Sequence, residues 1–244
     1  MRERRQCHNG CMSNLSVHRV NFGYFIRPAE ETDAGVSRVE PCFGYLVNHP
    51  DGVLLVDTGM GADPAVDDHY RPVRKDLGEA VHSLGFDLED VKYVANCHLH
   101  FDHCGGNPTL SDRTFYVQRI ELDTARSTEF YTLPQLIDPP GLDYEVLDGE
   151  AEVQDGVVII PTPGHTDGHQ SVVVISGDGT VVIAGQCHDS ATGYAADDLA
   201  LRSRLEGNSK IPVITPAWLE RLQSMDPRRV VFAHDQAVWE PLHN

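Results

Sequence analysis

One short segment of the chain concentrates side chains that can bind metal ions. It places His98, His100, Asp102 and His103 within six residues, directly after the apolar residues 91–95. Imidazole nitrogens and carboxylate oxygens are ligands that suit Zn²⁺ and other first-row metals. Alternate side chains of an extended segment project to the same side, so two ligand pairs can face two adjacent positions. The pattern predicts two metal ions, or one ion with a spare half-site; the competing interpretation is a metal-free surface loop rich in histidine.

The composition indicates one large globular domain that acts on a small molecule. The 244 residues are 41% hydrophobic, which is enough for a substantial core. The formal net charge of −18 argues against a nucleic acid as partner. No apolar stretch approaches the length that spans a membrane, and no secretory signal follows the basic first residues. We therefore expect a cytoplasmic protein, with an oligomeric state that the sequence leaves open.

The cysteines do not suggest a disulfide scaffold, because six of them in a chain of this length are too few (Cys7, Cys11, Cys42, Cys97, Cys104 and Cys187). We expect reduced thiols. Cys7 and Cys11 could form a metal knuckle with nearby histidines, but no second cysteine pair completes it. We therefore expect a flexible N-terminal arm at residues 1–19 and a single domain at residues 20–244.

Short apolar runs separated by turn signals predict an α/β fold. Strands are expected at residues 20–26, 43–48, 53–57, 91–95, 114–117, 157–160, 171–175, 180–184 and 229–233. Helices are expected at residues 76–84, 119–126 and 216–223, and a long loop at residues 128–142. His98, His165, Gln186 and His234 each follow one of these strands. An α/β scaffold builds a site from such strand ends, so we expect these side chains to meet at one rim.

The residues from His98 to His103 resemble the HxHxDH signature of the metallo-β-lactamase superfamily. Three other motifs occur in the superfamily's order, namely VDTG at residues 56–59, TPGHT at residues 162–166, and the late His234. Within the superfamily, the sequence is most similar to the N-acyl homoserine lactonases, at residues 98–107, 117–119, 162–171 and 233–235. The resemblance covers residues 40–236. It implies a four-layer αβ/βα sandwich with a metal site at one edge between two mixed sheets.

The resemblance also implies roles for individual residues. One metal would be held by His98, His100 and His165, and the other by Asp102, His103 and His234. Asp57 would orient a ligating imidazole by accepting its outer N–H. The implied cofactor is Zn²⁺, as one or two ions, with another divalent first-row metal as the alternative.

One residue departs from the family pattern where both metals would be bridged. The family supplies an aspartate there, whereas Gln186 follows the apolar residues 181–185 in this chain. An amide is neutral and offers one good oxygen, so it does not compensate the charge of the metal ions. The repulsion between two unit charges ~4 Å apart is about 4 kcal/mol at an effective dielectric constant of ~20, so the affinity for a second ion should fall. Three outcomes stay open: Gln186 binds weakly, His188 or Asp189 replaces it, or the site works with one tightly held ion.

A second departure concerns the substrate. The lactonases place a substrate-binding tyrosine three residues after the bridging aspartate, and Asp189 stands at that position here. Tyr194, five residues further on, is the alternative that a loop could bring to the substrate. The two departures leave the substrate more open than the reaction type.

We therefore expect a metal-dependent hydrolase that opens a lactone similar to an N-acyl homoserine lactone. Metal-bound hydroxide would attack the ester carbonyl, because a metal lowers the pKa of bound water. Asp102 is the candidate catalytic residue that takes up the proton and passes it to the leaving alkoxide. The alternatives are another ester or thioester hydrolase similar to glyoxalase II, and a metal-binding protein whose catalysis is reduced or lost because of Gln186.

Overall fold

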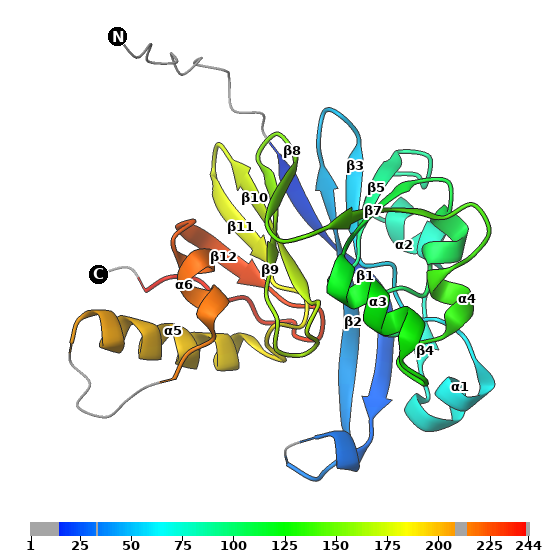
Figure 1. Ribbon diagram of the computed structural model, residues 1–244, viewed down its shortest axis with the longest axis horizontal. Coiled ribbons are helices and arrows are strands. Elements are labelled where there is room, and N and C mark those ends of the chain that lie inside the picture. The colour runs from blue at the N-terminus through cyan, green and yellow to red at the C-terminus, as the bar shows by residue number, and fades with distance from the viewer. Residues whose placement is uncertain (1–14, 33, 208–213, 243–244) are drawn as a thin grey trace.

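The computed structural model describes residues 15–32, 34–207 and 214–242. Two mixed β-sheets face each other, and helices cover the outer face of each sheet (Figure 1). The first sheet has the strand order β4 (Val73–Arg74), β1 (Ser16–Arg27), β2 (Arg38–Asn48), β3 (Val53–Val56), β5 (Val91–Ala95), β6 (Thr114–Gln118) and β7 (Asp143–Leu147). The second has the order β12 (Pro227–Val231), β11 (Gly179–Ile183), β10 (Gln170–Ser176), β9 (Val157–Pro161) and β8 (Ala151–Gln154).

The helices complete four layers. The first sheet carries α1 (Pro64–Tyr70), α2 (Leu77–His82), α3 (Arg119–Ser127) and α4 (Pro134–Ile137), together with the 3₁₀ turns η1 (Ala29–Glu31) and η2 (Asn107–Leu110). The second sheet is covered by α5 (Ala191–Leu205) and α6 (Ala217–Gln223), seen on the opposite side of the molecule in Figure 1. The predicted αβ/βα sandwich is therefore confirmed.

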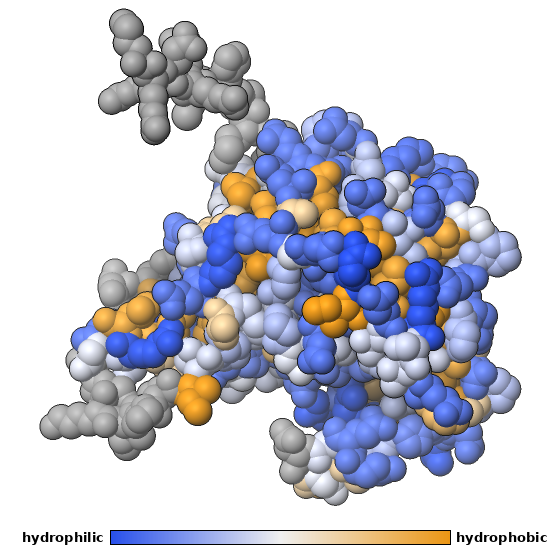
Figure 2. Space-filling view, in the orientation of Figure 1, coloured by the Kyte–Doolittle hydropathy of each residue, from blue (hydrophilic) through white to orange (hydrophobic). Residues whose placement is uncertain are grey.

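The apolar character of the central strands explains why they lie inside. β3, β5, β6 and β7 are parallel, and every residue of β3 is buried. Parallel strands are covered on both faces, which favours continuous aliphatic runs over an alternating pattern. Between the sheets, one apolar cluster joins residues of both (Tyr45, Val56, Ala95, Ile159, Val172, Ile183 and Val231). Hydrophilic residues dominate the face drawn in Figure 2, and apolar residues form smaller separate patches among them.

Direct hydrogen bonds join the two sheets at the edge where several strands end. The Phe43 N–H of β2 donates to the Ala233 carbonyl just after β12 over 2.9 Å, and the buried Tyr45 hydroxyl donates to the Phe232 carbonyl over 2.7 Å. Nearby, Gln170 at the start of β10 donates its side-chain amide to the carbonyls of Asn96 and Tyr116. These bonds fix the spacing of the sheets where the metal-binding side chains emerge.

The predicted strands and helices agree with the structure to within a few residues, but some elements had no clear sequence signal. The predicted loop at residues 128–142 contains the short helix α4. α1, β7, β8 and α5 were not expected. α5 was difficult to predict because its buried face is only weakly apolar. That face includes Ala191 and Asp198 beside Tyr194 and Leu201.

The predicted N-terminal arm extends too far along the chain. β1 begins at Ser16, so residues 16–19 pair with β2 and belong to the sheet. The candidate knuckle residues Cys7 and Cys11 lie outside the described residues. Every cysteine among the described residues is a free thiol (Cys42, Cys97, Cys104 and Cys187). A search of these residues found no helix with the length and apolarity needed to cross a membrane.

A close approach of two backbones places the histidine-bearing loop against the loop after β3. The Gly105 N–H donates to the Gly59 carbonyl over 2.7 Å, and a Cβ on Gly105 would lie 2.1 Å from the Gly61 nitrogen. Because backbone atoms cannot move aside as a side chain can, we expect Gly105→Ala to lower the free energy of unfolding by about 2–4 kcal/mol. Chemical denaturation measures this change.

The matched control is Gly177→Ala, in the exposed turn between β10 and β11. A Cβ there meets no atom within 4 Å, so we expect a change of about 0.5 kcal/mol or less. Equal stability of the two variants would contradict the close packing of the two loops.

Candidate metal centre

The first group of candidate ligands comes from the loop after β5 and the loop between β9 and β10. His98 Nε2 lies 3.0 Å from His100 Nδ1, which lies 3.2 Å from His165 Nε2. The ligand nitrogens of these three residues all lie within 4.8 Å of one another. Two chain segments more than sixty residues apart therefore direct their imidazoles at one point.

The second group joins the same loop to the segment after β12. His103 Nε2 lies 3.1 Å from His234 Nε2, and Asp102 Oδ2 lies 3.6 Å and 3.4 Å from these two nitrogens. The donors of His98, Asp102 and His103 also lie within 4.8 Å of one another, so the two groups are adjacent. All six predicted ligands thus meet at one edge between the sheets.

The chemistry of these donors fits divalent metal ions. Tetrahedral Zn²⁺ with Zn–N bonds of about 2.0–2.1 Å places its ligand nitrogens about 3.3 Å apart. The observed separations of 3.0–3.6 Å fall around this value. His100 Nδ1 faces two other imidazole nitrogens, and one proton on it can serve only one hydrogen bond. A shared cation satisfies all of these lone pairs at once.

The outer nitrogens of two ligands are held so that their inner nitrogens face the site. His103 Nδ1 lies 2.9 Å from Asp57 Oδ2, and His234 Nδ1 lies 2.9 Å from the Pro41 carbonyl. Such bonds fix both the orientation and the tautomer of a ligating imidazole. Asp57 therefore occupies the orienting position that the family resemblance implies.

Asp57 also ties the end of β3 to the loop after β5. Its Oδ1 accepts the Cys97 backbone N–H over 2.8 Å, and its Oδ2 accepts the Cys97 thiol over 3.0 Å. The backbone of Asp57 is left-handed, with φ of 62°, an uncommon conformation for a residue other than glycine. Strained residues of this kind cluster at functional sites, where surrounding contacts hold them.

Glu121 is a buried carboxylate that the sequence did not single out. One oxygen accepts the Leu99 backbone N–H over 2.7 Å and the Tyr131 hydroxyl, and the other accepts the Thr166 hydroxyl over 2.7 Å. This carboxylate on α3 thereby links the loop that carries His98 and His100 to the loop that carries His165. The sequence feature that could have indicated Glu121 is its position two residues after residues 117–119, which resemble the lactonases.

Burial and neighbouring charges set the protonation states. Burial, followed by His103 and His100, lowers the pKa of His98 well below the usual value, and burial lowers the pKa of His100 to about 4. Burial alone would raise the pKa of Asp102, but His103 and His234 lower it to about 2. At neutral pH, His98 and His100 are therefore neutral and Asp102 is anionic, which are the forms that bind metal.

His103 is the exception among the imidazoles. Burial lowers its pKa, but the carboxylates of Asp102 and Asp57 outweigh that effect and raise it. Its Nδ1 donates to Asp57, and its Nε2 faces His234 and Asp102. A bound cation would compete with a proton on Nε2, so metal uptake at this position releases a proton.

Gln186 lies beside the two ligand groups. It is buried and lines a cavity together with His100, Asp102 and His165. Its amide Nε2 donates to Asp189 Oδ1 over 3.3 Å. A neutral amide therefore borders the candidate ligands.

The other two candidates for the bridging position lie elsewhere. The His188 ring lies 5.7 Å from the rings of Tyr194 and Trp218, and its Nε2 lies 3.1 Å from Asp197. Asp189 is exposed and forms an ion pair with Arg38 over 3.4 Å. His188 therefore belongs to the packing under α5, and the Asp189 carboxylate accepts the Gln186 amide at the border of the site.

Tyr194 does not reach the cavity at the ligands. Its side chain is fully buried in the cluster between the second sheet and the helices α5 and α6, against Phe232 and Trp239. Its hydroxyl accepts a hydrogen bond from Gln223 Nε2 over 3.1 Å. Five residues beyond Asp189, the chain has already entered α5, and the helix directs this ring into the core.

The cavity at the ligands has a volume of about 100 Å³ and an aromatic wall. Phe25, Tyr70 and Phe101 line it, and the last two rings stack with centroids 4.8 Å apart. Arg27 supplies its cationic side chain, held by two hydrogen bonds from its Nε to the Glu40 carboxylate. An apolar group and a polar carbonyl can therefore both be accommodated beside the metal ligands.

Comparison with known proteins agrees with this geometry. Residues 37–186 match the model of the metallo-beta-lactamase superfamily. The chain belongs to this superfamily. Among its relatives, the N-acyl homoserine lactonase AttM of Rhizobium johnstonii is 32% identical over 220 residues, which cover 80% of this chain and 82% of that protein. An N-acyl homoserine lactonase of Bacillus sp is 35% identical over 147 residues, so the chain spans little more than half (58%) of that curated relative.

Solved structures of the superfamily share the fold. A quorum-quenching N-acyl homoserine lactone hydrolase superposes with a TM-score of 0.70 at 24% identity, over 92% of this chain and 94% of that one. AidC, a dizinc quorum-quenching lactonase, gives a TM-score of 0.63 at 17% identity, over 96% of each chain. These structures show the shared fold, and the 32% identity to AttM over 82% of its length places the chain in the lactonase branch that its motifs resemble.

Glu121 offers a test of how the ligands are positioned. We expect Glu121→Gln to weaken metal binding by about 10–100-fold, because the loops of His100 and His165 lose their shared anion. Competition with a chromophoric chelator measures this affinity. The control is Asp123→Asn, an exposed carboxylate on the same helix, which should leave it unchanged. A variant that loses thermal stability but binds metal as tightly as the native protein would contradict a positioning role.

Proposed function

We propose that this protein is a metal-dependent hydrolase that opens a lactone of the N-acyl homoserine lactone type. The observation that carries the proposal is the convergence of six metal-binding side chains on a cavity with an aromatic wall. The lactonase relatives support the same substrate class. Zn²⁺ fits the imidazole-rich donor set, and when bound it would acidify water and polarise a carbonyl oxygen.

Different residues would bind the metal ions, transfer the proton and orient the ligands. His98, His100 and His165 would hold one ion, and Asp102, His103 and His234 the other. We assign proton transfer to the Asp102 carboxylate, because an anionic carboxylate can accept a proton as water attacks and pass it to the leaving alkoxide. Asp57 keeps the ring of His103 in place during this exchange.

The cavity lining suggests how the substrate is held. The rings of Phe25, Tyr70 and Phe101 offer an apolar surface to the acyl group of the substrate. Arg27 and the Gln186 amide are the polar groups beside the metal ligands. We propose that they bind the amide or ester oxygens of the substrate, in place of the tyrosine that the lactonases carry.

Gln186 favours one strongly held ion and a weaker second one. The amide removes a negative charge from the position between the two ligand groups, so two divalent ions repel each other with less compensation. The same observation supports the alternative of a member with reduced catalysis. The free thiols of the described residues fit a cytoplasmic location, which we also propose.

Hydrolysis of N-hexanoyl homoserine lactone tests the proposed substrate class. We expect the zinc-loaded protein to open the ring, with one proton released per turnover in a weakly buffered assay with a pH indicator. We expect His100→Ala to lower the rate by more than about a hundredfold, since it removes a ligand that faces two others. The exposed His82, bonded to Asp87, supplies the control variant His82→Ala, which should retain the native rate.

The same assay separates the alternatives. Faster turnover of an open-chain ester or an S-acyl thioester would identify a different hydrolase of this superfamily. Metal-loaded protein that is inert to all three substrates would favour a member that has lost catalysis. Native turnover by His100→Ala would contradict a metal-dependent reaction.

The charge at position 186 gives a separate prediction about metal content. We expect Gln186→Asp to raise the affinity for the second ion by at least about tenfold, because it places an anion between two cations. Equilibrium dialysis against limiting Zn²⁺, followed by mass spectrometry of bound metal, measures the ions per chain. Gln135→Asp, which adds the same charge at an exposed position on α4, is the control. Equal metal content in both variants would show that residue 186 does not bridge the ions.

A further inference from the structure

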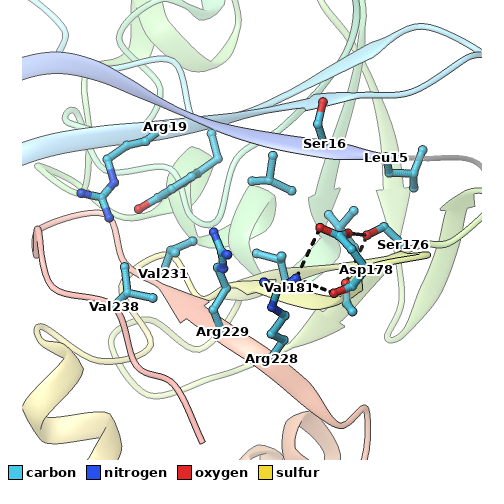
Figure 3. Close-up of a pocket in the computed structure, with 14 residues that line it drawn as sticks. Leu15, Ser16, Arg19, Ser176, Asp178, Val181, Arg228, Arg229, Val231 and Val238 are labelled. Carbon is cyan, nitrogen blue, oxygen red and sulfur yellow. Dashed lines mark hydrogen bonds and ion pairs between the residues drawn. The ribbon is translucent and has the colours of Figure 1, made fainter.

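A second and larger cavity lies between the two sheets, away from the metal ligands. It has a volume of about 520 Å³ and opens between the start of β1 and the start of β12 (Figure 3). We call it the inter-sheet cavity. Its volume falls in the range of about 300–1,000 Å³ that is typical of small-molecule sites.

The inter-sheet cavity and the cavity at the metal ligands share no lining residue. The inter-sheet cavity extends along β12, from Arg228 and Arg229 near its start to Val231 at its end. His234 follows three residues after Val231, so the two sites differ in the residues that line them and are not separated by a whole strand. Arg19 and Arg229 line the inter-sheet cavity alone.

Two arginines without carboxylate partners border this cavity. Figure 3 shows Arg19 on β1 and Arg229 on β12 at the cavity. The described residues place no carboxylate in an ion pair with either, and the buried Nε of Arg229 has no hydrogen-bond partner. Arg19 donates to the Gln236 carbonyl over 3.1 Å and lies over the Phe43 ring at 4.8 Å. In a chain of net charge −18, two such arginines in one cavity indicate a site for an anion.

A neighbouring arginine shows the contrast. Arg228 also lines the cavity, but it forms an ion pair with Asp178 over 3.4 Å and donates to the Asp178 carbonyl over 2.6 Å. The Asp178 carboxylate also accepts the Ser176 hydroxyl. The Asp178 carboxylate is therefore paired with Arg228, and the ion pairs of the described residues include neither Arg19 nor Arg229.

The rest of the lining is apolar. Val174 and Val231 are buried side chains that line the cavity, and Val181 and Val238 extend the same surface outward. Burial of an apolar chain against such a surface gains about 25 cal/mol per Å². A guanidinium group pairs with carboxylate or phosphate oxygens through two parallel hydrogen bonds.

We propose that the inter-sheet cavity binds an amphipathic anion, with a carboxylate or phosphate head held by Arg19 and Arg229 and an apolar chain packed between the sheets. This site is separate from the metal centre and does not depend on lactone hydrolysis. Its ligand would be a lipid-like acid or a phosphate ester with a medium-length alkyl chain.

Calorimetric titration of the full-length zinc-loaded protein tests the proposal, with decanoate, decyl phosphate and 1-decanol as probes. We expect at least one anion to bind, and the neutral alcohol to bind about tenfold more weakly or not at all. We expect Arg19→Gln and Arg229→Gln each to weaken anion binding by about tenfold or more, because each removes charged hydrogen bonds. Arg228→Gln removes the same charge from an arginine that is already paired, so it should leave the affinity within about twofold.

The metal centre could itself bind these anions, and His100→Ala separates the two sites. Anion binding that persists in His100→Ala and is lost in Arg229→Gln supports the proposal. Binding lost in His100→Ala but kept in both arginine variants places the anion on the metal and overturns it. Equal binding of decanol and decanoate, or no binding of either anion, also overturns it.

A crystal structure of the native protein with a bound probe tests the site without variants, which could fail to fold. A crystal grown with 10-bromodecanoate should show an anomalous bromine peak between β1, β10 and β12. A preference for decanoate or for decyl phosphate in the titration would identify the head group. A bromine peak confined to the metal centre, or none, would contradict the proposed site.

Discussion

The site depends on one constraint, namely that six candidate metal-binding side chains must be brought close together from loops of both sheets. Such a cluster is unfavourable unless every outer polar atom is bonded. Two buried carboxylates meet this requirement. Asp57 binds the Cys97 N–H and the His103 ring, and Glu121 binds the Leu99 N–H and the Thr166 hydroxyl. Both anions lie just outside the ligands and orient them.

The rest of the fold supplies rigid ends for these loops. The parallel strands β3 and β5 end side by side, which places Asp57 next to Cys97. The hydrogen bond from Phe43 to Ala233 closes the two sheets at the same edge and carries His234 to the site. Precision at the metal centre therefore comes from hydrogen bonds between the sheets, whereas the inter-sheet cavity lies between β1 and β12.

Gln186 places a neutral amide beside the candidate ligands. In the proposed arrangement this amide stands where an aspartate would compensate the charge of a second cation. The surrounding structure remains that of the superfamily, because Asp57 and Glu121 hold the ligand loops through the backbone N–H groups of Cys97 and Leu99. These contacts do not involve residue 186, so the proposal predicts a change in metal content without a change of fold.

The sequence alone was enough to identify the superfamily, through four separated motifs, and that resemblance implied the layered α/β fold and the six candidate ligands. It could not place Tyr194, since its direction depends on how α5 packs against β11 and β12. Glu121, the inter-sheet cavity and the unpaired Arg229 were also decided only by the tertiary structure. Each of them depends on contacts between residues far apart in the chain, and periodicity or spacing carries no information about such contacts.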